Sequence, residues 1–300
     1  MRKGQMVRVK CEGVSVFLLL VFAALHHTVK ADLRKLDMAL DAVDDIFSQC
    51  QDKMLKAVTE IDGLLQKELK DDKEFEELWR KYSGTCKKNI TGGTSYHIDA
   101  LEAYGNSKPK FRKMFNNLVY SKGNNTLTYR DEFPFKSLHF LLTDSVRLLK
   151  PTNKCETKYY ATRNTYTADT GTEVRFGKFI NAKNTLSSTI EELEPKEDGV
   201  TMFNITSCSV INVEENTCTS EEIQCLISPA EVFTVEDVRD ATTDDDTTYK
   251  LITLTHSRFL SNHNCAFFHR NSADVESSTS LIFTLLALTA SLLTQFTVME

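Results

Sequence analysis

The chain has 300 residues, of which 41% are hydrophobic and 26% are charged, with a formal net charge of −6. An acidic chain lacks the basic electrostatic footprint of a nucleic-acid-binding protein, so nucleic acid is excluded as a partner.

The N-terminus has the plan of a cleaved secretory signal over residues 1–31. Its apolar core, residues 14–25, follows Arg2, Lys3, Arg8 and Lys10, and small residues stand at Val29 and Ala31. This order of a basic region, a short apolar core and small residues predicts cleavage after Ala31. An uncleaved anchor is the alternative, but the apolar core is short for a membrane span.

Between the two ends, the first half of the chain has helical periodicity. Apolar residues recur at steps of three and four over residues 35–68, and amphipathic stretches follow at 74–82, 96–101, 110–120 and 135–149. Such spacing predicts helices that bury one face. The basic run from Lys108 to Lys113 is interpreted as a helix face and linker.

The second half is rich in Val, Ile, Thr and Phe, which predicts strands. These stretches are 173–179, 201–211, 223–227, 231–235 and 249–256, and turn residues separate them. Helices followed by strands predict the α+β class. We expect Asp244–Asp246 to form a solvated hairpin tip. No glycine-rich phosphate loop occurs, which argues against a Rossmann or P-loop nucleotide site.

The C-terminus carries a second apolar stretch, residues 281–298, after which only Met299 and Glu300 follow. Small residues near Asn271, or later at Ser277, precede a polar spacer and this tail, which is typical of a glycosylphosphatidylinositol (GPI) attachment signal. We expect attachment at Asn271 and removal of residues 272–300. A secreted or single-pass protein is the alternative.

The predicted ectodomain therefore spans residues 32–271 on the outer face of the plasma membrane. Residues 1–31 carry a net charge of +4 and residues 272–300 carry −3, so the ectodomain carries −7. Three sequons, at Asn89, Asn124 and Asn204, predict glycosylation.

Seven cysteines remain after the signal, and in a secreted protein they should pair, leaving at least one free or intermolecular. They are Cys50, Cys86, Cys155, Cys208, Cys218, Cys225 and Cys265. No CxxC or His-flanked pair occurs, so no metal site is predicted.

Several segments, in their order and spacing, resemble the vertebrate ecto-ADP-ribosyltransferases, a family of GPI-linked or secreted enzymes that modify arginine. The matching segments are LDMAL (36–40) with VDD (43–45) before Cys50, FKSLHFLLTDSVRLL (135–149), CETKYY (155–160), EVRFGKF (173–179), EEIQCLI (221–227) followed by Pro229, and Asn264-Cys265.

The resemblance implies a helical N-terminal part, beginning with a helix near residue 36, beside a mainly β, split sandwich that cradles NAD. It also implies two disulfides, Cys50–Cys265 and Cys155–Cys208. Of the remaining cysteines, a Cys218–Cys225 bridge that leaves Cys86 free stays open.

The family's reaction breaks the nicotinamide–ribose bond of NAD, and a fixed carboxylate stabilises the positive charge that grows on the ribose. That carboxylate is the second Glu of an ExE motif, and the first Glu steers the acceptor arginine. In this sequence the two positions are Glu222 and, at the catalytic place, Gln224.

The resemblance also places the cofactor-binding residues. The arginine that holds the NAD diphosphate corresponds to Tyr160, with Arg163 as a shifted alternative. The family's serine stretch follows Phe179 and reads Ile180-Asn181-Ala182-Lys183 here, with Ala182 as the candidate.

The predicted function is transfer of mono-ADP-ribose from NAD, used as a co-substrate, to arginine of surface or extracellular proteins. A catalytically silent member of the family that acts as a surface binding protein is the alternative, because Gln224 carries no charge.

Overall fold

The computed structural model describes residues 33–150, 154–191, 199–219, 223–243 and 248–268. The predicted signal segment, Asn271 with the apolar tail, and Asp244–Asp246 lie outside these residues.

The helical half of the chain forms one layer. Its elements are α2 (Gln51–Thr59), α3 (Leu64–Asp71), α4 (Lys73–Tyr82), α5 (Ser95–Gly105), α6 (Pro109–Ser121), the π-helical turn η1 (Thr128–Glu132) and α7 (Lys136–Leu149). Their apolar faces share a core in which the rings of Phe75, Phe111 and Phe115 surround Phe135 edge to face. Helix α4 begins after a capping residue: the Asp72 carboxylate accepts a hydrogen bond from the Phe75 N–H.

The second half forms strands, with two short helices, α8 (Leu186–Ile190) and α9 (Val213–Asn216), and a last turn, η2 (Ala266–Phe268). The strands are β1 (Arg34–Lys35), β2 (Glu156–Thr162), β3 (Tyr166–Thr167), β4 (Glu173–Arg175), β5 (Ile180–Ala182), β6 (Thr201–Ser207), β7 (Val210–Asn212), β8 (Cys225–Ile227), β9 (Glu231–Thr242) and β10 (Thr248–Phe259). The larger sheet has the order β2-β6-β10-β9-β4, the smaller has β5-β8-β7, and β1 pairs with β3. Within the larger sheet only β6 and β10 run parallel.

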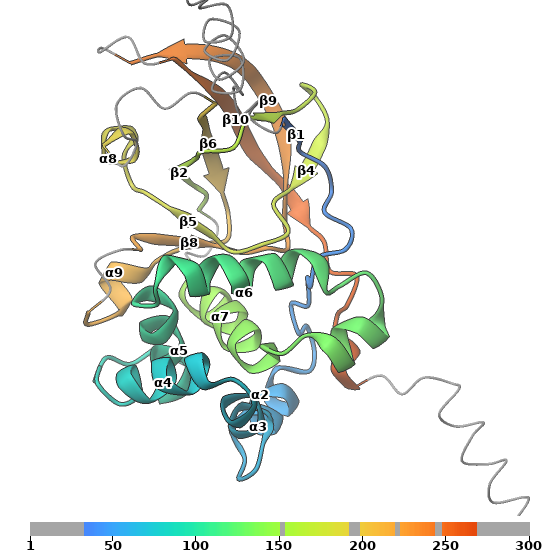
Figure 1. Ribbon diagram of the computed structural model, residues 1–300, viewed down its shortest axis with the longest axis vertical. Coiled ribbons are helices and arrows are strands. Elements are labelled where there is room, and N and C mark those ends of the chain that lie inside the picture. The colour runs from blue at the N-terminus through green and yellow to red at the C-terminus, as the bar shows by residue number, and fades with distance from the viewer. Residues whose placement is uncertain (1–32, 151–153, 192–198, 220–222, 244–247, 269–300) are drawn as a thin grey trace, which may run out of the picture.

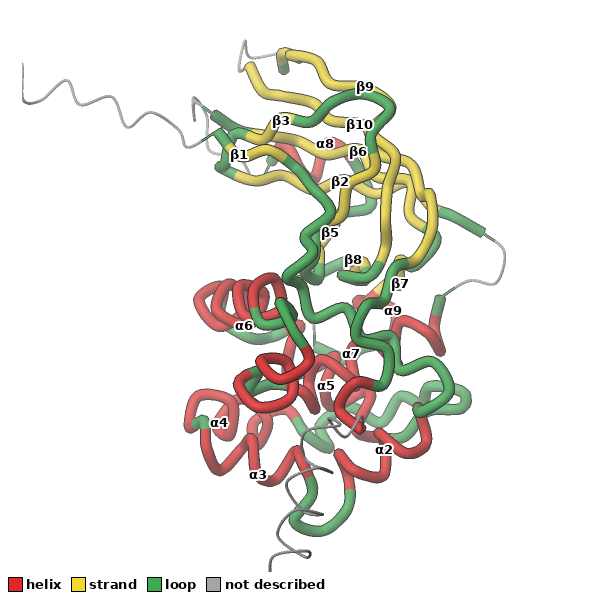
Figure 2. Tube along the Cα trace, turned by 90° about the vertical axis from the view of Figure 1, so that its right-hand side faces the viewer, coloured by secondary structure: helices red, strands yellow, loops and turns green. Residues whose placement is uncertain are grey.

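The two sheets pack face to face and stand above the helical layer (Figures 1 and 2). Ile180 of β5 and Ile227 of β8 share a core with Phe203, Phe233 and Leu254 of the larger sheet. Helix α6 lies along the boundary, directly below β5 and β8 (Figure 1). The α+β class and the split sandwich of the prediction are confirmed.

The expectation of a helix near residue 36 is wrong. Residues 36–50 follow an irregular path in which Ala39, Phe47 and Gln49 have positive φ values of 44°, 55° and 76°. Their backbone groups bond distant parts of the chain, for example the Val43 N–H to the Val119 carbonyl at 2.7 Å. Leu36, Val43 and Phe47 are buried without helical hydrogen bonds, whereas Leu40 of the same spacing is exposed.

Arg175, at the end of β4, holds this irregular segment in place. Its side chain is fully buried, and its guanidinium bonds the Asp44 carboxylate at 2.7 Å and the carbonyls of Met38, Ala39 and Leu260. Burial by itself raises the pKa of Asp44, but hydrogen bonds from His263 and Arg175 outweigh it and hold that pKa below its usual value. One ion pair thus joins the N-terminal segment, the sheet and the C-terminal segment.

Three disulfides cross-link the described residues. Two are the pairs that the resemblance implies, Cys50–Cys265 and Cys155–Cys208. The third joins Cys86 to Cys218, so the Cys218–Cys225 alternative is wrong. Cys225 lies in β8 with its side chain in the core between the sheets, whereas Cys218 follows α9 at the helical layer.

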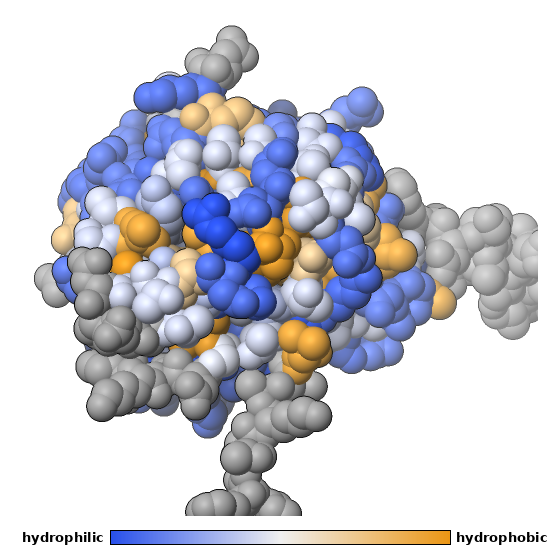
Figure 3. All heavy atoms as spheres, turned by 90° about the horizontal axis from the view of Figure 1, so that it is seen from above, coloured by the Kyte–Doolittle hydropathy of each residue, from blue (hydrophilic) through white to orange (hydrophobic). Residues whose placement is uncertain are grey.

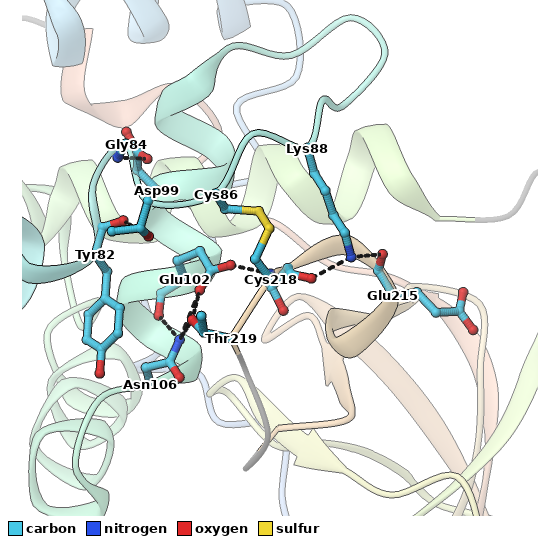
Figure 4. The surroundings of a disulfide bond; sticks show 12 residues. Tyr82, Gly84, Cys86, Lys88, Asp99, Glu102, Asn106, Glu215, Cys218 and Thr219 are labelled. Carbon is cyan, nitrogen blue, oxygen red and sulfur yellow. Dashed lines mark hydrogen bonds between the residues drawn. A yellow bond between two sulfur atoms is a disulfide. The ribbon is translucent and has the colours of Figure 1, made fainter.

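The Cys86–Cys218 disulfide lies within a polar cluster between the two layers (Figure 4). The buried carboxylate of Glu102 accepts hydrogen bonds from the Cys218 N–H and the Thr219 hydroxyl. From the other side, the Lys88 ammonium donates to the Glu215 carbonyl at 2.8 Å and to that of Thr217. Residues 217–219 are therefore fixed on α5 just before the chain reaches β8.

The face seen from above, over the sheets, has small hydrophobic groups separated by hydrophilic side chains (Figure 3). No helix within the described ranges has the length and hydrophobicity needed to cross a membrane.

We predict that Arg175→Met lowers the free energy of unfolding by about 3–5 kcal/mol, because it leaves the Asp44 charge buried without its partner. Urea unfolding measures this change. Arg239→Met is the control: the Arg239–Asp237 pair is exposed, and its loss should cost less than about 1 kcal/mol. Equal effects of the two substitutions would contradict the role given to Arg175.

We also predict that the native protein, with its signal segment removed, resists labelling by a maleimide at neutral pH. Cys225 is the free cysteine of the described residues, and burial raises the pKa of its thiol to about 11, which suppresses the reactive thiolate. Labelling in denaturant without reductant should then modify Cys225 alone, as mass spectrometry of peptides would reveal. Rapid labelling of the native protein would contradict the burial of this thiol.

Candidate active-site cleft

A cleft opens between α6 and the strands β2 and β5. Its first lobe has a volume of about 560 Å³. The residues lining this first lobe are Pro109, Arg112, Tyr159, Tyr160, Ala161, Asn181, Ala182, Lys183, Thr189 and Ile223. Two cationic side chains and several polar groups face it, and no carboxylate is among the described residues that line it.

A second hollow of about 380 Å³ adjoins the first lobe and shares Pro109, Arg112, Tyr160 and Asn181 with it. We call this hollow the basic lobe, because Arg34, Arg112, Lys113 and Lys178 line it and no acidic residue of the described chain does. In a chain of net charge −6 this distribution is uneven, and it favours an anionic ligand.

Gln224 directly follows Ile223, which lines the first lobe, and precedes β8, but Gln224 is not itself among the lining residues. Its side chain is half-buried, and its Oε1 accepts a hydrogen bond from the backbone N–H of Asn184 at 3.0 Å. The Asn184 side chain in turn accepts from the Lys158 ammonium at 2.7 Å and from the Cys225 thiol at 3.2 Å. Gln224 is therefore held by the turn that follows β5. Glu222 lies outside the described residues.

Tyr160 on β2 lines both lobes. Its ring stacks on Phe203 with centroids 5.7 Å apart and meets Phe176 edge to face. Burial raises the pKa of its hydroxyl, so this side chain presents a neutral phenol to the cleft. Arg163, the shifted alternative, is exposed and lines neither lobe.

The β5 candidates are also at the cleft. Phe179 is buried, lines the basic lobe and stacks on Phe115 of α6, and Ala182 lines the first lobe. Between them Asn181 lines both lobes, and its Oδ1 accepts a hydrogen bond from the buried Tyr104 hydroxyl at 3.2 Å. Sequence reasoning missed Asn181, although the alternation of Ile180, Asn181 and Ala182 along a strand marked it as the polar position.

The run from Lys108 to Lys113 forms a helix face and the residue before it, as predicted, and Lys108, Lys110 and Lys113 are exposed. The sequence did not show that Arg112 and Lys113 line the cleft; the Arg112 guanidinium also donates to the Ser107 carbonyl. Of the predicted glycosylation sites, Asn89 and Asn124 are exposed, and Asn204 is half-buried within β6.

Two clusters of potential metal ligands occur in the described part of the chain. Each contains a cysteine that is already in a disulfide, namely Cys218 with Cys86 in one and Cys208 in the other. A disulfide sulfur is no thiolate ligand, so neither cluster has a full ligand set.

Comparison with known proteins identifies this arrangement. The family model described as "NAD:arginine ADP-ribosyltransferase" matches residues 36–256, which is more than half of the chain. The chain is 28% identical to Ecto-ADP-ribosyltransferase 5 of Bos taurus over 78% of this chain and 75% of that protein. It is 30% identical to T-cell ecto-ADP-ribosyltransferase 2 of Mus musculus, over 79% of this chain and 78% of that protein.

Among solved structures, the fold matches a variant of the eukaryotic mono-ADP-ribosyltransferase ART2.2 in complex with NAD. The TM-score is 0.59 at 26% identity, and the match covers 77% of this chain and 98% of that one. The chain therefore belongs to the NAD:arginine ADP-ribosyltransferase family.

Proposed function

We propose that the protein binds NAD in the cleft between α6 and β2–β5 and transfers ADP-ribose to arginine side chains of extracellular or cell-surface proteins. The observation that carries this proposal is a cleft lined by cations, with no carboxylate among its described lining residues and with Ile223, the neighbour of Gln224, in its wall. It lies where the family's sequence pattern expects NAD and the catalytic side chain.

In this reaction the bond between ribose C1′ and the nicotinamide nitrogen breaks, and nicotinamide leaves with the bonding electron pair. Positive charge develops on the ribose, and a guanidinium nitrogen of the acceptor arginine then bonds to C1′ and loses a proton. A carboxylate beside C1′ would stabilise the developing charge. Glu222 and Gln224 hold the two positions of the motif here.

The hydrogen bond to Asn184 determines what Gln224 can offer. The backbone N–H of Asn184 is a donor, so it takes the Gln224 carbonyl oxygen and leaves the amide NH₂ for the cleft. An amide carries no net charge. A unit charge about 4 Å away, at an effective dielectric near 20, is worth roughly 4 kcal/mol, which corresponds to about a thousandfold in rate. We therefore propose slow transfer by this chain.

We predict that Gln224→Glu raises NAD turnover with an arginine analogue by about 10²- to 10³-fold. A glutamate has the same shape and keeps one oxygen for the Asn184 N–H, while its second oxygen brings the missing charge to the ribose. Release of nicotinamide by the purified protein measures turnover, and transfer to the analogue is followed by mass spectrometry.

Gln224→Ala is the matched control, because it removes the amide without adding charge and should abolish the wild-type activity. If neither wild type nor Gln224→Glu turns over NAD and neither binds it, the transferase proposal fails. That outcome would favour the silent surface protein.

We also propose that the mature protein is residues 32–271, on the outer face of the plasma membrane with a GPI anchor at Asn271. The support is the order of charged, apolar and small residues at both ends of the chain. The names of the two relatives describe ecto-enzymes. Glycans at Asn89, Asn124 and Asn204 are part of the same proposal.

We predict that a phosphatidylinositol-specific phospholipase releases the protein from the surface of cells that express the full chain, because only the lipid would hold it there. Immunoblotting of the medium measures release, and a known GPI-anchored protein in the same cells is the control. Retention on cells whose control is released would contradict the anchor.

A further inference from the structure

Lys178 is a half-buried cation at a constrained position of the backbone. Gly177 before it has a positive φ of 60°, and a Cβ there would lie 2.5 Å from the Ala39 Cβ, so only glycine fits. Phe179 after it is buried against Phe115. The backbone on both sides is fixed, and Lys178 lines both the basic lobe and an adjoining hollow of about 290 Å³.

Within the described ranges no carboxylate is paired with Lys178. No hydrogen bond or ion pair there involves its ammonium, and no carboxylate lines the basic lobe. Burial lowers the pKa of Lys178, and the nearby Arg34 lowers it further. Asp37 lines the adjoining hollow together with Lys178; one of its oxygens accepts a hydrogen bond from the Ala39 N–H at 2.7 Å, and no ion pair joins Asp37 to Lys178 in the described residues.

The wall opposite Lys178 is rigid. Asn116 of α6 accepts a hydrogen bond from the Phe179 N–H at 3.0 Å and donates one to the Tyr104 hydroxyl at 3.0 Å. These bonds fix α6 against the segment that carries Lys178. Arg112 and Lys113 lie on this helix, so the backbone that carries these cations is joined to the segment that carries Lys178.

Phosphate is the anion that this donor set fits. Lysine presents a compact point charge and arginine a planar fork, and both bind phosphate oxygens by charge-assisted hydrogen bonds. The lobe adjoins Tyr160, the position at which the family resemblance expects the arginine that holds the NAD diphosphate. A phenol cannot supply that charge.

We propose that the basic lobe is a phosphate-binding subsite in which Lys178, with Arg112 and Lys113, holds the diphosphate of the dinucleotide in place of an arginine on β2. The identity of the dinucleotide rests on the proposed function, whereas the binding of phosphate does not. The strand arginine is thus replaced by cations from the β4–β5 connection and from α6.

The test measures dissociation constants by calorimetry for inorganic pyrophosphate, NAD, NADP and nicotinamide riboside. The proteins are wild type, Lys178→Met and Lys113→Ala, with Lys110→Ala as the control. Lys110 is exposed on α6, as Lys113 is, but does not line the cleft. Methionine keeps the apolar stem of Lys178, and the unfolding midpoint checks that the fold is retained.

We expect Lys178→Met to weaken the binding of pyrophosphate and of NAD by about tenfold or more. Lys113→Ala should weaken the binding of both less, because Lys113 is more exposed. Nicotinamide riboside has no diphosphate, so its binding should not change, and Lys110→Ala should change nothing. If Lys178→Met does not fold, the contrast between Lys113→Ala and Lys110→Ala gives the same test.

Each other outcome is decisive. Pyrophosphate binding that depends on Lys178, without NAD binding, would support the subsite and contradict the proposed function. NAD binding that is unchanged in Lys178→Met and Lys113→Ala would overturn the subsite and leave the proposed function standing. If these substitutions weakened the binding of NADP alone, the diphosphate assignment would be overturned, because the lobe would then hold the additional phosphate that NADP carries. Failure of wild type to bind any phosphate-containing probe would overturn the subsite.

Discussion

The buried ion pair between Arg175 and Asp44 is the interaction on which the rest of the structure depends. Neither charge reaches solvent, and each is satisfied by further hydrogen bonds, Arg175 to carbonyls and Asp44 to the backbone and side chains of residues 262–263. A buried pair of this kind contributes little net stability relative to apolar packing, but removing one partner is costly. It therefore specifies one arrangement of three chain segments. The Cys50–Cys265 disulfide makes that arrangement covalent.

This arrangement reaches the cleft through the backbone that follows Arg175. Gly177 packs against Ala39 of the irregular N-terminal segment, and the next residue is Lys178 of the basic lobe. On the opposite side, Asn116 and Tyr104 join α6 and α5 to β5. The cleft thus lies at a seam between two layers whose spacing is set by buried polar contacts as well as by apolar packing.

The sequence predicts the regular elements well where side-chain pattern and backbone agree. The long apolar period before residue 150 predicts α7, and the β-branched stretches after residue 200 predict β6 and β10. The pattern fails over residues 36–50, which follow an irregular path, leave Leu40 exposed and bond to the backbone of Val119 and Arg175. Apolar periodicity indicates which side chains tend to be buried. It does not indicate which groups the backbone N–H and C=O groups will bond.

At the cleft, the sequence locates Gln224, Tyr160, Phe179 and Ala182 through resemblance. Net charge does not show how charge is distributed, and for that reason Arg112, Lys113 and Lys178 were not expected to face one hollow. The Cys86–Cys218 pair joins residues 132 positions apart, and no local pattern links them. Contacts of this kind follow from the tertiary fold.

The contacts of Asp44 also set an order of assembly during synthesis. A chain made from its N-terminus presents Asp44 long before Arg175, and residues 262–265 follow much later. Early domains of a growing chain usually fold first, but contacts of such large sequence separation must wait for their partner. The contacts of Asp44 with residues 262 and 263 can therefore form only after those residues have been made. A chain that stops short of residue 262 would lack these partners of Asp44, so a segment near the C-terminus completes the surroundings of one near the N-terminus.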